Sequence, residues 1–142
     1  WETSGRRMAG MWGTGVDAFD TISAYPIVEF ISDGTSGEFR AYNTTDGSWF
    51  SMGLPTGFAY DAWTTLEMSI VGSNWVATVG DLTVTQDANG TVAFDNVILQ
   101  GHNTTDGVSY DIYWDNFDTV PAPGALALLG LAGMAKSRRR SA

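Results

Sequence analysis

The sequence predicts an all-β fold, an antiparallel β-sandwich, on three observations. Residues 66–70 alternate apolar and polar side chains with a period of two, as a half-buried strand does. Gly80 and Asp81 form a tight-turn signal between two further strand-like segments. Turn-forming residues recur about every ten positions, which is the spacing expected of a sandwich or jelly roll, and residues 1–119 lack helical periodicity.

The strand pattern extends over most of residues 1–119. Besides 66–70, strands are expected at 18–22, 26–32, 38–43, 75–79, 82–85, 91–94, 97–100 and 109–117. Alternation within the last segment places Trp114 on the buried face and Tyr113 on the outward face. Trp63 and Trp75 also occupy positions where a core residue is expected. Aromatic residues make up 13% of the sequence, which is enough to fill such a core.

Length and charge divide the 142-residue chain into two parts. We expect a β-sandwich domain over residues 1–119, within the about 100–150 residues common for one domain, and a tail over 120–142. The domain carries all 16 acidic residues and only three of the seven basic ones, so its net charge is −13. This charge excludes nucleic acid as a partner, because it repels phosphate backbones. The absence of cysteine excludes disulfides and thiol catalysis.

The tail combines three features. An extended linker comes first, because proline fixes φ and keeps the preceding residue out of a helix. The linker residues are Val120, Pro121, Ala122 and Pro123. Residues 125–135 are uncharged and apolar, which predicts a short C-terminal hydrophobic helix below the about 20 residues of a stable membrane span. The arginines that follow, expected on the cytoplasmic side of a membrane, are Arg138, Arg139 and Arg140.

This order of Pro linker, short apolar run and Arg cluster resembles the PEP-CTERM sorting signal, with Ala122 where the family has Glu. The resemblance covers residues 120–140 and implies export across the inner membrane of a Gram-negative bacterium. It further implies that an exosortase recognises and cleaves the tail. The inner membrane is then a transient partner, and the cell surface or extracellular matrix is the destination. The alternative is an ordinary C-terminal signal-anchor or amphipathic helix.

The order of segments 38–42, 62–66, 75–81 and 113–117 resembles the concanavalin A-like, or laminin-G-like, jelly rolls. The resemblance implies a jelly roll over residues 16–118. Because the chain is shorter than such domains, we expect one or more N-terminal strands before Trp1, so that residues 1–119 are a fragment of a larger domain.

The pattern of acidic residues argues against an enzyme. The laminarinase-like glycosidases of that fold carry Glu-x-Asp-x-x-Glu on one strand, and Glu67 lacks acidic partners at those offsets. Asp111 and Asp115 share a strand face but would lie about 13 Å apart. Glycoside hydrolysis requires two carboxyl groups about 5–10 Å apart. His102 is the only histidine, and no Gly-x-Ser-x-Gly motif accompanies it. A glycoside hydrolase is therefore a distant third function.

Oxygen-rich loops make a structural Ca²⁺ ion a candidate cofactor, since Ca²⁺ takes carboxylate and amide oxygens as ligands. The candidate ligands are Asp33, Asp106, Asp115 and Asn116. Residues 87–90 begin like an EF-hand loop but lack its distal Glu, so they are interpreted as a hairpin turn. The alternative is that all these residues cap turns and keep the surface acidic.

Aromatic side chains next to polar loops make glycan or exopolysaccharide the candidate ligand. Tyr42, Trp49 and Tyr113 are the residues expected to form an exposed platform for sugar rings. The leading function is that of an exported, non-catalytic surface or matrix protein that binds glycan. The alternative is a purely structural envelope or biofilm component without a ligand site. Burial of all three rings would favour the structural role.

Overall fold

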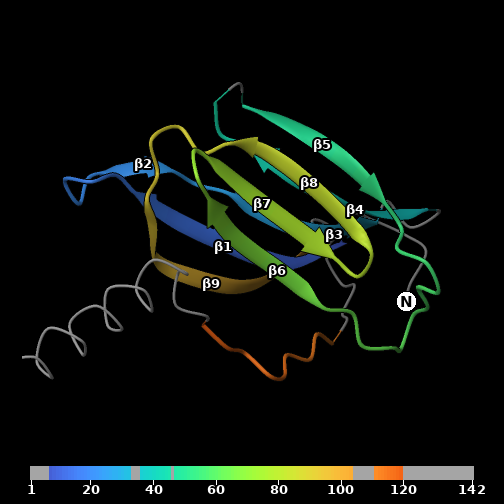
Figure 1. Ribbon diagram of the computed structural model, residues 1–142. Helices are drawn as coiled ribbons and strands as arrows, with labels where there is room; N and C mark the ends of the chain where they lie inside the picture. Colours follow the sequence, from blue (N-terminus) through green and yellow to red (C-terminus); the bar gives the residue numbers. More distant parts are fainter. Residues whose placement is uncertain (1–6, 33–35, 46, 104–110, 120–142) are drawn as a thin grey trace, which may run out of the picture.

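The structure, a computed structural model, describes residues 7–32, 36–45, 47–103 and 111–119 (Figure 1). Within these ranges the protein is all-β, with nine strands in two antiparallel sheets and no helix. The predicted all-β, antiparallel class is therefore confirmed. The short hydrophobic helix expected after residue 124 lies outside the described residues.

Six strands form the larger sheet. They are β1 (Arg7–Val16), β2 (Ile22–Ala24), β3 (Ile27–Ser32), β4 (Gly37–Asn43), β5 (Ser48–Gly53) and β9 (Ala93–Asn103). β9 pairs along one side of β1, while β2 and β3 pair in succession along the other side. Tyr25 and Pro26 separate β2 from β3, and the amide of Gly13 donates to the carbonyl of Pro26 at 2.9 Å. β4 and β5 continue the sheet beyond β3.

Three strands form the smaller sheet, which lies in front of the larger one in Figure 1. They are β6 (Leu66–Val71), β7 (Asn74–Val79) and β8 (Leu82–Asp87), joined by two hairpins. Gly72 and Gly80 have φ of 62° and 57° in the connecting turns, a conformation that glycine adopts without steric cost. The predicted hairpin with its turn at Gly80 and Asp81 is confirmed.

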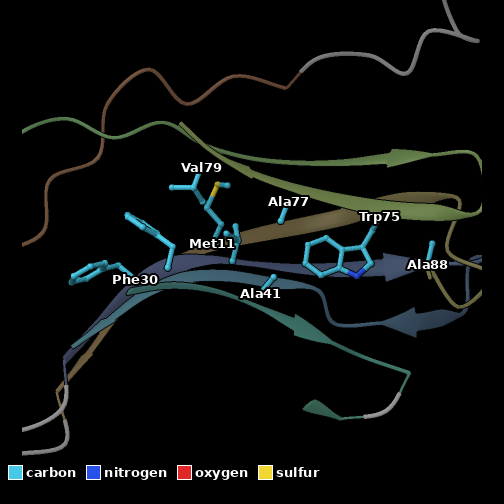
Figure 2. Packing of buried hydrophobic residues seen from close by; sticks show 9 residues of the cluster. Met11, Phe30, Ala41, Trp75, Ala77, Val79 and Ala88 are labelled. Atoms are coloured by element: carbon cyan, nitrogen blue, oxygen red, sulfur yellow. The ribbon is translucent and has the colours of Figure 1, made fainter. Parts of the chain in front are cut away.

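The hydrophobic core lies between the two sheets (Figure 2). Each sheet turns one face of alternating side chains toward it, as strand geometry requires. Trp75 of β7 is 1% exposed and reaches between the sheets. The buried cluster comprises Met11, Val28, Phe30, Phe39, Ala41, Trp75, Ala77, Val79 and Ala88.

Most of the predicted strands are confirmed, and a turn replaces one of the others. The segments 38–43, 66–70, 75–79 and 82–85 fall in observed strands, and 26–32 matches β3 apart from Pro26. Residues 93–94 and 97–100 of the last two segments belong to the single strand β9. The strand predicted at 18–22 is wrong. The Asp17 carboxylate accepts hydrogen bonds from the amides of Phe19 and Thr21, at 2.8 and 3.0 Å, so this segment is a turn up to the start of β2.

The strand predicted at 109–117 is also wrong for the part that the structure describes. Residues 111–119 contain no strand, and Trp114 is exposed rather than buried. Trp63, expected in the core, is 71% exposed. In contrast, β1 and β5 were not predicted, although β1 is the strand to which β2, β3 and β9 all pair.

A carboxylate clamp joins the segment after β5 to the β7–β8 turn. Asp81 accepts hydrogen bonds from the hydroxyl of Thr56 at 2.7 Å and from its amide at 2.9 Å. These bonds favour the ionised form and hold the pKa of Asp81 below its ordinary value of 3.8, the hydroxyl bond being the larger cause.

Replacing Thr56 by Val, which removes the hydroxyl and keeps the amide, is expected to raise the pKa of Asp81 toward 3.8. A depressed pKa in the folded state adds stability above the unfolded pKa, and this contribution is lost as the pH falls through the folded pKa. The wild-type protein should therefore be more stable than Thr56→Val at neutral pH, and the difference should vanish in strong acid. Denaturant melts across this pH range test the expectation, and a difference independent of pH would contradict it.

Candidate functional site

The residues predicted for sorting and processing all lie outside the described part of the chain. They are Val120, Pro121, Ala122, Pro123, Arg138, Arg139 and Arg140. Among the described residues, no helix combines the length and apolar character that a membrane span needs. The sorting tail thus stays a prediction from the sequence.

Of the four candidate calcium ligands, Asp33 and Asp106 also lie outside the described residues. Asp115 and Asn116 are exposed, and the amide of Asn116 donates to Asp115 Oδ1 at 2.8 Å. In the described ranges no three His, Asp or Glu side chains come close enough together to hold a metal ion. The predicted turn at 87–90 is confirmed, because the amide of Asn89 donates to Asp87 Oδ1 at 2.6 Å.

Two of the three predicted platform residues meet on the larger sheet. Tyr42 of β4 lies directly opposite Trp49 of β5, and their ring centroids are 5.1 Å apart with a tilt of 58°. The connecting turn is fixed by the amide of Gly47, which donates to the carbonyl of Asn43 at 2.9 Å with Gly47 at φ 71°. Trp49 is 39% exposed and Tyr42 is half-buried. The rings therefore form a partly exposed pair that the hairpin holds in register.

Arg40 links this aromatic pair to a buried carboxylate. Its guanidinium carbon lies 3.7 Å from the centroid of the Trp49 ring, within the range of a cation–π interaction. The same guanidinium places Nε at 2.7 Å and Nη2 at 2.5 Å from Oε1 of Glu29, the residue opposite Arg40 on β3. Glu29 is 0% exposed. Arg40 is thus anchored by an ion pair and in turn fixes one face of Trp49.

Glycine makes room for that ion pair. Gly10 of β1 lies opposite Glu29, and a Cβ added at Gly10 would come within 2.4 Å of both the Glu29 Cβ and the Val28 carbonyl oxygen. No residue with a side chain fits there without a shift of the two strands. The buried carboxylate therefore depends on a glycine that sequence reasoning did not single out.

Tyr113, the third predicted platform residue, lies apart from the pair. It is 74% exposed and belongs to the segment 111–119, which contains no strand. In Figure 1 this orange segment lies beyond β6 and β9, whereas β5 lies at the opposite side of the molecule. The structure does not join Tyr113 to Tyr42 and Trp49.

The register instead adds residues that sequence reasoning missed. Direct pairing connects Tyr42 to Ile27, Ile27 to Trp12, and Trp12 to Ile98. Residues paired directly in antiparallel strands share a face of the sheet. We call this set the transverse row; it consists of Ile98, Trp12, Ile27, Tyr42 and Trp49. It lies on the outer face, because its neighbours Met11, Val28 and Ala41 point into the core.

A shallow hollow of about 140 Å³ adjoins one end of the transverse row. It is lined by Trp12, Thr14, Tyr25 and Ile98. The signal that could have identified it is the pair of aromatic residues Trp12 and Tyr25. Trp12 lies opposite Ile27 at the start of β3, and Tyr25 lies in the gap between β2 and β3. Its walls are mostly apolar, with the hydroxyl of Thr14 as a polar group.

The protein is thus all-β, with two antiparallel sheets, and it exposes aromatic side chains on the outer face of the larger sheet. No protein-family model, curated protein or solved structure matches the chain. The case for a function therefore depends on the chemistry of this face and of the sequence.

Proposed function

We propose that this protein is an exported, non-catalytic surface or matrix protein whose β-sheet domain associates with glycan. The observation that carries the proposal is the pair of Tyr42 and Trp49 on a sheet face, in which Trp49 is exposed and contacted by Arg40. Such a rigid aromatic pair offers a large apolar contact at a small entropic cost, since the rings are ordered before a ligand arrives.

The chemistry of sugars matches this arrangement. A pyranose ring presents C–H groups on its faces and hydroxyl groups at its rim, so it needs an apolar platform bordered by hydrogen-bonding side chains. Next to Trp49, the hydroxyl of Ser51 donates to the carboxylate of Glu38 on the neighbouring strand. The platform thus has polar groups within reach of its edge, as small-ligand sites commonly do.

The remaining parts of the proposal come from the sequence. A domain with a net charge of −13 and a tail of Pro linker, apolar run and Arg cluster supports export and exosortase-type sorting in a Gram-negative bacterium. The two packed antiparallel sheets are compatible with a concanavalin A-like jelly roll. In this role the domain binds its ligand without altering it, so the proposal assigns no catalytic carboxylates.

A glycan array tests the proposal. The full chain, with calcium present, is expected to bind neutral polysaccharides, and Trp49→Ala should lose most of the signal. Trp63→Ala serves as the matched control, because Trp63 is 71% exposed but outside the transverse row. An array without hits, or equal loss of signal from both variants, would contradict glycan binding and leave the purely structural role.

A further inference from the structure

The transverse row crosses the larger sheet at right angles to its strands. Trp12 on β1 and Trp49 on β5 are separated by β3 and β4, which amounts to three strand spacings, or about 14 Å. Ile27, between them, is buried, while Trp12 is 37% exposed and Trp49 is 39% exposed. The row therefore presents two exposed indoles on either side of a lower apolar centre.

The hollow beside Trp12 gives the row a second contact point. Tyr25 and Ile98 are both exposed, and they border the hollow with Trp12. On its polar side, the hydroxyl of Thr14 donates to Asn96 Oδ1 at 3.1 Å, and Asn96 in turn donates to Asp95 at 3.0 Å. The volume of about 140 Å³ is below the about 300 Å³ at which drug-sized pockets begin, so the hollow suits one small ring.

The charges around the row select an uncharged ligand. Arg40 is the only Lys or Arg whose side chain the structure describes, and it is engaged by Glu29 and by the Trp49 ring. Glu38 and Asp95 add negative charge near the two ends of the row. An anionic polysaccharide would meet repulsion from these two carboxylates, and the described side chains include no further Lys or Arg to bind it.

From this geometry we propose that the transverse row is a linear binding track for an extended, uncharged glycan. The glycan chain runs across the strands, with one sugar ring on Trp49 and Tyr42 and another in the hollow of Trp12 and Tyr25. A β-1,4-linked glucan fits best, because it is a flat ribbon whose ring faces lie along a straight line. This inference deepens the proposed function and rests on it.

Calorimetry with cellobiose and cellohexaose on the full chain tests the track. The hexasaccharide is expected to bind at least tenfold more tightly than the disaccharide, because only the longer chain spans both contact points. Trp12→Ala should weaken cellohexaose binding about tenfold, which corresponds to about 1.4 kcal/mol. Tyr25→Ala, a second and independent change in the hollow, should act in the same direction. Trp63→Ala should change nothing, and thermal melts establish that each variant is folded.

The outcomes separate this inference from the proposed function. If Trp49→Ala abolishes binding while Trp12→Ala and Tyr25→Ala bind cellohexaose like the wild type, the track is overturned and glycan binding stands. If the wild type ignores cellohexaose but binds another glycan on the array, the flat-ribbon ligand is overturned and glycan binding again stands. If no glycan binds at all, both fail together.

Discussion

Replacing Arg40 by Met is expected to lower the free energy of unfolding by about 3–5 kcal/mol. The reason is the partner that the change leaves behind. Glu29 is 0% exposed and accepts two contacts from the Arg40 guanidinium through one oxygen, at 2.7 and 2.5 Å. Without Arg40, the buried carboxylate loses the charge that contacts it at 2.5 and 2.7 Å, which costs far more than loss of a surface ion pair. Urea denaturation followed by circular dichroism measures the change.

The double variant Glu29→Met/Arg40→Met is the control for this explanation. Replacing both partners of a buried ion pair by apolar residues of similar size is often close to neutral. We therefore expect the double variant to be clearly more stable than Arg40→Met alone, a non-additive result typical of directly contacting residues. A double variant as unstable as the sum of the single changes would contradict the assigned role of the pair.

Replacing Trp75 by Ala is expected to cost about 3–5 kcal/mol, the range for large aromatic residues in cores. Trp75 is 1% exposed and lies between the two sheets, so its removal leaves a cavity that neither sheet closes without moving (Figure 2). The protein should denature at much lower urea concentration, with the transition followed by far-ultraviolet circular dichroism.

Trp75→Phe is the matched variant. The indole Nε1 of Trp75 is buried and has no hydrogen-bond partner among the described residues. A phenyl ring keeps most of the packing and removes this unpaired donor, whose burial carries a cost of its own. We expect a much smaller loss than for Ala. Equal losses for Phe and Ala would contradict the assigned role of the Trp75 ring in filling the core.

The strands that were predicted correctly are those in which apolar and polar residues alternate along the sequence. Residues 66–70 and 75–79 place apolar residues at every second position, and Gly80 supplies the positive φ of the turn that follows 75–79. Periodicity is local information, so it located these strands without knowledge of their partners. The same logic correctly placed Trp75 in the core.

The prediction missed β1 because glycine hides its alternation. Gly10, Gly13 and Gly15 occupy positions where a side chain would reveal the pattern, and Gly10 is there for the close approach of Glu29. The opposite error occurred at 109–117, where alternation is present but residues 111–119 contain no strand. Strand formation needs a partner edge, and a single sequence does not show which edges are available.

The candidate site was predicted only in part, because most of its residues come together through pairing between strands that are distant in sequence. Tyr42 and Trp49 are close in sequence, so one hairpin brings them together. Trp12 joins this face only through the pairing of β1 with β3, and Tyr25 comes beside it because β2 and β3, which it connects, both pair with β1. Likewise the ion pair of Glu29 with Arg40 follows from the register of β3 with β4, which no local pattern gives.

The most direct test of the central claim is a nitrogen-15 NMR titration of the tryptophan indoles with cellohexaose. Each indole N–H gives its own signal, and Trp→Phe variants assign them. We predict that the signals of Trp12 and Trp49 move on titration, while those of Trp63 and the buried Trp75 stay in place. Movement of Trp63 alone, or no movement of Trp12 and Trp49, would contradict glycan binding on the outer face of the larger sheet.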